Sequence, residues 1–234
     1  MPPRQIEARS RTVLFALGEP VAFVALVFSF LLGLALRAVA MRFTARVVGL
    51  GDGRPLVRFS PRHDIDPFGA VAAAIGGMGW GRQLTVDEVP RWRGRGRAAA
   101  VFAAGPVACI LAGELIIAGF ALVHPTLALA VLNPGEILRG SPMPIAEQVA
   151  LSLGTGLLAF GLLALIPIPP LDGFGILWNA LRKPGPSMAW MRLWFEDKNI
   201  GALILLVCAF FPTMYPMLMR IIDLLGILFL RIWA

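Results

Sequence analysis

The chain has 234 residues, of which 58% are hydrophobic and only 15% are charged. A soluble globular domain is about half apolar and about a quarter charged, so the composition excludes an ordinary soluble protein. The formal net charge of +7 is typical of arginine-rich loops beside an anionic leaflet. We expect no nucleic-acid binding, because the basic residues flank apolar spans and form no soluble module. The composition therefore predicts an integral protein whose first partner is the lipid bilayer.

The N-terminal third contains one clear span and one short apolar segment. Residues 1–15 carry three arginines and are expected to lie at the membrane interface. The first span runs from Pro20 to about Met41, and Arg37 near its end is expected to snorkel toward the head groups. In the polar stretch that follows, Arg54–Ser60 has the alternation of a short strand or hairpin. Ala70–Gly79 is too short to span upright, since a span needs about 20 residues, and we expect it to be re-entrant or packed closely between helices.

The remainder of the chain predicts further helices. Two long apolar runs occupy Ala98–Val123 and Ala146–Ile166, and a short helix is expected over Leu177–Leu181. The last apolar block, 200–234, is broken by Pro212 and Pro216 into two C-terminal helices. The sequence therefore predicts an all-α polytopic membrane protein with about five to six transmembrane helices and a short re-entrant or β-hairpin segment. We expect residues 1–234 to form a single membrane domain.

The arginines and lysines of the loops predict the topology. If Ala70–Gly79 is re-entrant, the loops 42–62, 82–97 and 182–198 share one face with 14 positive residues, against 4 on the other face. If that segment spans, the numbers become 12 and 6. Both satisfy the positive-inside rule, and they place the N-terminus on opposite sides of the membrane. The re-entrant arrangement is the more biased of the two.

The third long apolar run leads directly into a proline-rich turn with one carboxylate. Residues 165–177 read LIPIPPLDGFGIL, and proline ends the helix because it lacks the amide donor. Asp172 follows the prolines, and a carboxylate at membrane depth is costly enough to suggest a functional site. The structural alternative is that Asp172 caps a helix that begins at Gly173.

Several stretches, in the same order and at similar spacing, resemble the site-2 protease family of intramembrane zinc metalloproteases (peptidase family M50), particularly its short bacterial members. Residues 165–177 are similar to the family's NLLPIPPLDGGRIL element, and SPRHDIDPFG at 60–69 is similar to NPxxHIDPxG. Residues 79–113 resemble the stretch that runs from GWAKPVPV to ALAGPLSNLLLA, and Leu50-Gly51-Asp52 resembles the LGD after the zinc-binding helix. The resemblance covers residues 20–185 and implies a site-2-protease-like core.

The resemblance also implies a catalytic zinc, held by two histidines of an HExxH motif and by the aspartate of the LDG element. Counting back from Leu50-Gly51-Asp52 places the HExxH positions at Val39, Ala40 and Phe43. The two histidines of the chain are His63 and His124, so no HExxH is present. We therefore expect no catalytic residue, no metal and no other cofactor, with Asp172 as a vestigial ligand position.

These differences predict a catalytically inactive homologue that binds or regulates a transmembrane protein client in the cytoplasmic (inner) membrane of a bacterium. The predicted client groove or scaffold motif comprises Gly105, Pro106, Pro167, Pro169, Pro170, Leu171, Asp172 and Gly173. One alternative is an active zinc peptidase in which His63, Asp64 or Asp66 joins Asp172 as an atypical ligand. Another is a transporter or channel component whose path is lined by Glu114 and Asp172.

Overall fold

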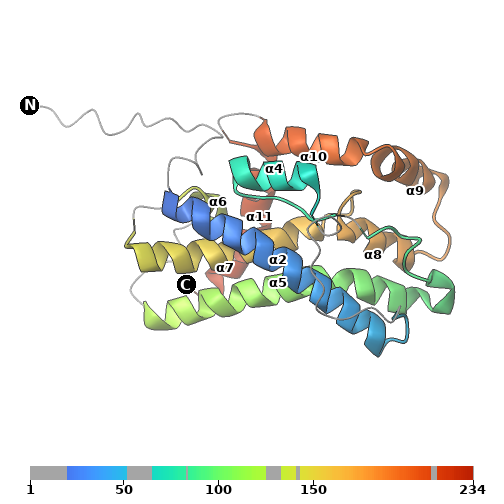
Figure 1. Cartoon of the computed structure of the whole chain (residues 1–234), viewed down its shortest axis with the longest axis horizontal. Coiled ribbons are helices and arrows are strands. Elements are labelled where there is room, and N and C mark those ends of the chain that lie inside the picture. Colours follow the sequence, from blue (N-terminus) through green and yellow to red (C-terminus); the bar gives the residue numbers. More distant parts are fainter. Residues whose placement is uncertain are drawn as a thin grey trace, which may run out of the picture.

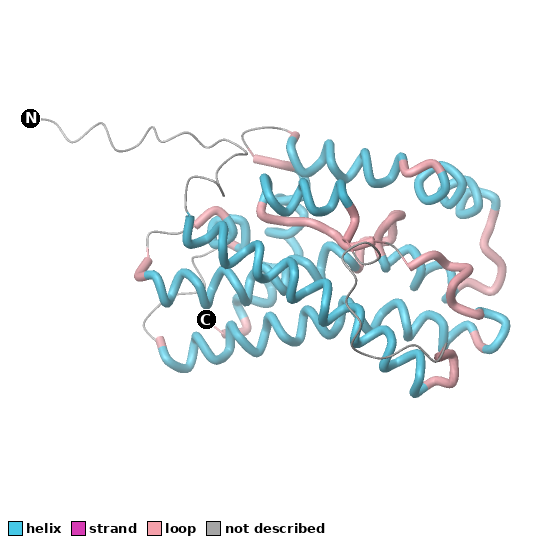
Figure 2. Tube along the Cα trace, in the orientation of Figure 1, coloured by secondary structure: helices cyan, strands magenta, loops and turns pink. Residues whose placement is uncertain are grey.

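The computed structural model describes residues 20–51, 65–82, 84–124, 133–140, 143–211 and 215–233 (Figure 1). Helices joined by loops make up the described part of the chain (Figure 2). The predicted interfacial segment 1–15 and the predicted strand at 54–60 lie outside the described residues. The longer helices are α2 (Pro20–Val47), α4 (Pro67–Gly76), α5 (Arg95–Val123), α7 (Ile145–Ala164), α8 (Asp172–Ala180), α10 (Ile200–Phe210) and α11 (Met217–Arg231), and the shorter ones are η1 (Arg91–Arg93), α6 (Pro134–Leu138), α9 (Pro186–Met191) and η3 (Arg192–Asp197).

Helices α2, α5 and α7 lie side by side and form the centre of the fold (Figure 1). Glycines allow α5 and α7 to approach closely, because a Cβ on Gly113 would lie 2.7 Å from the Gly154 carbonyl oxygen. These three helices are the ones long and apolar enough to cross a membrane among the described residues. At about 1.5 Å per residue, α7 with its 20 residues already matches a hydrocarbon core of about 30 Å.

The predicted five to six spans are not confirmed. The two C-terminal helices do form on either side of the Pro212–Pro216 region, as predicted, but α10 has only 11 residues and α11 has 15. At about 1.5 Å per residue neither reaches the thickness of an average bilayer core. The structure thus supports a membrane protein with three candidate spans and several shorter apolar helices.

The segment around α4 turns back on itself. Asp66 and Pro67 begin this helix: the Asp66 carboxylate accepts a hydrogen bond of 2.8 Å from the Gly69 amide. Gly77 ends the helix with φ of 73°, and Ile65 and Gly81 then pair in an antiparallel bridge. The two ends of the segment therefore lie together, and whether it enters the membrane stays a prediction.

After the α4 segment, the chain returns to the end of the molecule where α2 ends. Leu50, just after α2, packs in one hydrophobic cluster with Val86 and Val101. Helix α4 packs instead against α10, beside the three long helices (Figure 1). The polar loop 82–94 and the C-terminal end of α2 therefore share one end of the molecule.

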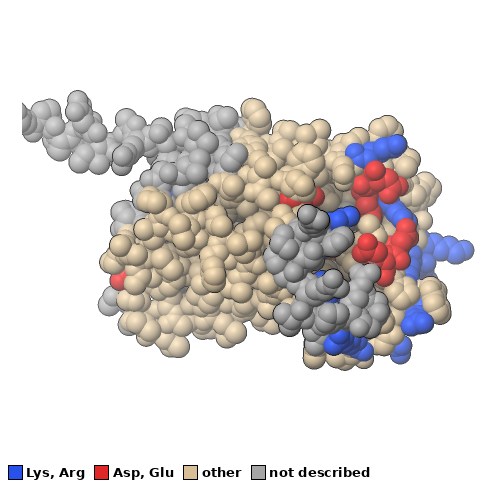
Figure 3. Space-filling view, in the orientation of Figure 1, with Lys and Arg blue, Asp and Glu red and all other residues tan. Residues whose placement is uncertain are grey.

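Charged side chains gather at that same end (Figure 3). Arg192 in η3 forms an ion pair with Asp87, and the Arg91 guanidinium donates a hydrogen bond to the Leu181 carbonyl oxygen. These contacts join the loop before α5 to the segment after α8. The opposite end, where α2 begins and α5 ends, shows few charges in the same view.

The proline-rich turn links α7 to α8 within this arrangement. Helix α8 begins at Asp172, with Leu171 in an extended conformation as its N-cap. This start is one residue before Gly173, the start expected if Asp172 were the cap, and five residues before Leu177. Gly173 permits the close return of the chain, since a Cβ there would lie 2.1 Å from the Leu165 carbonyl oxygen. On the other side, a Cβ on Gly201 at the start of α10 would lie 2.1 Å from the Pro169 carbonyl oxygen. The turn is thus held between α7 and α10.

Candidate functional site

The candidate site is a buried ion pair between α2 and the first residue of α8. The Arg37 Nε atom donates to Asp172 Oδ2 at 2.5 Å, and Arg37 Nη2 donates to Asp172 Oδ1. This is the two-point geometry that makes arginine–carboxylate pairs strong. The Asp172 side chain is 1% exposed and the Arg37 side chain 10% exposed, so water screens the pair little.

The prediction that Arg37 snorkels toward the head groups is wrong. Its side chain turns inward, because Asp172 offers a buried carboxylate, and Nη1 also donates to the Arg82 carbonyl oxygen at 3.2 Å. Asp172 correspondingly does not serve as the N-cap of α8, a place that Leu171 takes. Its carboxylate still lies in the first turn of α8, where the helix dipole favours a negative charge.

Small and apolar groups of α5 and α2 enclose the pair. A Cβ on Gly105 would lie 2.6 Å from Arg37 Cγ and 3.3 Å from Met41 Cγ, so this glycine allows α5 to pack directly on the arginine stem. The Cys109 thiol is fully buried close to the pair and donates to the Gly33 carbonyl oxygen at 3.4 Å. The site is therefore compact, and the Arg37 guanidinium lies against the Asp172 carboxylate.

These residues do not fit a zinc ion. A catalytic zinc site needs three protein ligands and one open position. Nowhere in the described ranges do three His, Cys, Asp or Glu residues come together as possible ligands. At Asp172 both carboxylate oxygens already accept hydrogen bonds from a permanently charged guanidinium, which would repel a divalent cation.

The HExxH positions predicted by counting back from Leu50-Gly51-Asp52 do not converge on Asp172. The Phe43 side chain is 57% exposed, and Val39 and Ala40 are half-buried. The α2 residue that contacts Asp172 is Arg37, two positions before Val39. The sequence contains one signal for it, since Arg37 is a cation inside an otherwise apolar run.

The structure brings most of the predicted groove residues into the interior. Pro169, Pro170, Leu171 and Gly173 are buried around Asp172, whereas Pro167 is exposed. Gly105 and Pro106 are buried in α5 on the other side of the pair. Residues from two distant parts of the sequence thus surround one ion pair, and their role in binding a client stays a prediction.

The residues of the two alternative predictions lie elsewhere or serve other contacts. Asp66 caps α4, and His63 and Asp64 lie outside the described residues. Glu114 accepts a hydrogen bond of 2.8 Å from Trp233 Nε1. His124 lies 3.7 Å from Glu147 at the end of α5, far along the helix from Arg95 and the charged end. None of these contacts involves Asp172.

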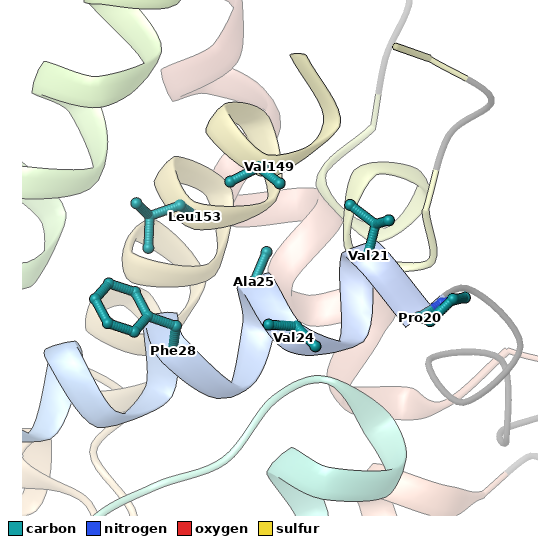
Figure 4. Close-up of a pocket in the computed structure, with 7 residues that line it drawn as sticks. All are labelled: Pro20, Val21, Val24, Ala25, Phe28, Val149 and Leu153. Atoms are coloured by element: carbon teal, nitrogen blue, oxygen red, sulfur yellow. The ribbon is translucent and has the colours of Figure 1, made fainter. Parts of the chain in front are cut away.

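A separate apolar groove of about 460 Å³ lies between the N-terminal half of α2 and the start of α7 (Figure 4). Val149 and Leu153 of α7 face Phe28 and Ala25 of α2 across it. All seven lining residues are apolar, so the groove offers no group for acid–base or metal chemistry. Phe28 precedes Arg37 by nine residues, or about 14 Å along the helix, which separates the groove from the ion pair.

Comparison with known proteins gives one curated relative to set beside this geometry. The chain is 28% identical, over 165 residues, to the "Putative zinc metalloprotease YwhC" of Bacillus subtilis (strain 168), and the alignment covers 68% of each chain. This similarity supports an M50-like family. No family model matches the chain, and no solved structure matches it. The relative is named for zinc chemistry, whereas the described residues of this chain form no zinc site.

Proposed function

We propose that this chain is a membrane-embedded, M50-like protein that binds a transmembrane partner and does not hydrolyse peptide bonds. The observation that carries the proposal is the two-point pair between Arg37 and Asp172. Asp172 occupies the position of the metal-ligating aspartate in the LDG element that the resemblance implies. With its carboxylate bound to a guanidinium, Asp172 cannot serve as a zinc ligand until the pair is broken.

The proposed client site lies beside the proline-rich turn. Pro167 is exposed while the following prolines are buried, so the turn presents one accessible edge next to a rigid, packed base. A partner's unwound segment would donate its own amides to carbonyl oxygens of this turn, because the prolines have no amide hydrogen and the amides of Ile168 and Leu171 bond within the turn. Photo-crosslinking from a probe at Pro167 should give a discrete protein product, whereas the same probe at Leu122, 82% exposed in α5, should give lipid adducts.

We further propose that the charged end faces the cytoplasm of a bacterial cell. The end shown in Figure 3 carries the loops 82–97 and 182–198, and the positive-inside rule assigns such loops to the cytoplasm. This orientation matches the re-entrant topology and its more biased distribution of arginines. Accessibility of single cysteines in intact cells, one at Arg93 and one at His124, would distinguish the two orientations, after both native cysteines are replaced.

The deciding experiment is zinc analysis of the purified protein in detergent. We expect far less than one zinc per chain and no cleavage of transmembrane substrates. One tightly bound zinc per chain, lost together with a peptidase activity on chelation, would overturn the proposal. That outcome would instead support the atypical-ligand hypothesis, and His63→Ala and Asp64→Asn variants would then identify the ligands.

A further inference from the structure

Arg37 is the α2 residue that contacts Asp172, and Met41 lies one turn further along the same face of the helix. These residues lie four apart and both are buried. Both also pack on Gly105, since a Cβ there would approach Arg37 Cγ at 2.6 Å and Met41 Cγ at 3.3 Å. Residues at i and i+4 share one helix face, one turn apart. Phe43, by contrast, is 57% exposed.

Two ligands at i and i+4 on one helix, facing a carboxylate from another element, constitute the geometry by which an HExxH helix holds zinc. In this fold the corresponding positions are Arg37, Ala38 and Met41, since Arg37 is the residue in contact with Asp172. The register obtained by counting back from Leu50-Gly51-Asp52 differs by two residues. The packing of the helix favours the register of Arg37 and Met41, because Arg37 contacts Asp172 and Met41 is buried on the same face, whereas Phe43 is exposed.

We infer that the Arg37 guanidinium takes the place of the metal ion, as a cation built into the chain that neutralises Asp172. The inference rests on the proposed M50-like relationship. A buried carboxylate needs a counter-charge, and a site that has lost its metal ligands must obtain one elsewhere. Arginine suits this role because its planar fork binds both carboxylate oxygens and keeps its charge at every physiological pH.

The guanidinium also makes a contact beyond Asp172. Arg37 Nη1 donates to the Arg82 carbonyl oxygen at 3.2 Å, just after the Ile65–Gly81 bridge. The built-in cation thereby joins α2, the start of α8 and the return of the α4 segment. This explains how the region around Asp172 can remain packed without metal.

The test is to restore the ligands in each register. The variant R37H/M41H places two imidazoles on the face that meets Asp172, and V39H/F43H places the same pair, with the same spacing, on the register counted from the sequence. Purified proteins in detergent are dialysed against zinc and against cobalt. Bound zinc is counted per chain, and the visible absorption of cobalt reports tetrahedral coordination.

We expect R37H/M41H to retain about one zinc per chain and to show the cobalt absorption. Both should be lost in R37H/M41H/D172N and be absent from V39H/F43H. Metal binding by V39H/F43H but not R37H/M41H, or equal and negligible binding by both in folded protein, would overturn the inference. Zinc in the wild-type chain would instead contradict the proposed function, so the two failures are distinguishable.

A second variant covers the case in which R37H/M41H does not fold. R37A leaves a buried space beside Asp172, and guanidinium ion at millimolar concentration should raise its melting temperature while the same concentration of sodium should not. The wild type, whose site is filled, provides the control. Equal responses of R37A to guanidinium and sodium would overturn the inference.

Discussion

Neutralising one partner of the Arg37–Asp172 pair should strongly destabilise the protein. The variant D172N keeps the shape of the side chain but removes the negative charge that the buried Arg37 guanidinium contacts at two points. Two unit charges about 4 Å apart interact by about 4 kcal/mol at an effective dielectric constant of about 20. Loss of one partner from a buried pair typically destabilises by about 3–5 kcal/mol, which agrees with that value. We expect a loss of this size because the Asp172 side chain is only 1% exposed.

Thermal unfolding in detergent, followed by tryptophan fluorescence, would measure this effect. A chain of this size loses about 2–4 °C in melting temperature per kcal/mol, so D172N should melt about 6–20 °C below the wild type. R37M should be destabilised similarly. The double variant R37M/D172N lacks both charges of the pair and should recover much of the lost stability. A double variant that is destabilised by less than the sum of the two single variants would show that Arg37 and Asp172 interact directly.

A second ion pair in the same chain supplies the control. Arg192 pairs with Asp87, but the Asp87 side chain is 72% exposed, so D87N should change stability by less than about 1 kcal/mol. A D172N variant that melts within a few degrees of D87N would refute the reasoning. It would mean that Asp172 is hydrated or that its pair with Arg37 does not form in the membrane.

Three further predictions concern other contacts. G105A should destabilise the protein by about 1–3 kcal/mol, because the added methyl group would overpack against the Arg37 stem. The control G119A, with no atom near the added Cβ, should be neutral or slightly stabilising. Equal melting temperatures of G105A and G119A would contradict the close packing. Burial raises the pKa of Glu196 above its ordinary value. The contribution of Glu196 to the free energy of unfolding is therefore fully present at acidic pH and is lost as the pH rises through the raised pKa. The melting temperature of the wild type should therefore fall relative to E196Q on raising the pH from about 4 to neutrality, and parallel profiles would rule this out. The Tyr215 hydroxyl donates a hydrogen bond to Asp223, which also accepts one from the Gly135 amide at 2.7 Å. Y215F should therefore destabilise the α6–α11 contact by about 1–3 kcal/mol in the same unfolding assay. An unchanged melting temperature would show that the Tyr215–Asp223 hydrogen bond is not formed.

Local patterns predicted the parts of the fold that depend on neighbouring residues. The cap of α4 was predictable because Asp66, Pro67 and Gly69 are adjacent in sequence. The three long helices begin and end within a few residues of their predicted limits, except that α2 continues to Val47. Hydrophobic runs of this length leave few alternatives to a helix in a bilayer, since every backbone amide must be satisfied internally.

Features that depend on distant contacts were missed. A helix start at Gly173 was one expectation and lies within one residue of the observed start, but the close neighbours that require Gly173 and Gly175 are distant in sequence. A Cβ on Gly175 would lie 2.3 Å from the Phe102 ring. Likewise, an arginine near a helix end ordinarily snorkels, and only the fold reveals that Asp172, 135 residues later, turns Arg37 inward.

That separation of 135 residues has a consequence for the synthesis of the protein. At about 5–20 residues per second, Asp172 is made about 7–27 s after Arg37. During that interval the Asp172 carboxylate is absent, and insertion of an arginine into an apolar helix is unfavourable by up to about 2.5–3.5 kcal/mol, the value for a helix centre. We therefore expect the first helix to reach its final depth only after the second half of the chain has entered the bilayer. Asp172, the partner of the ion pair that is made later, would then determine the depth of α2 in the membrane.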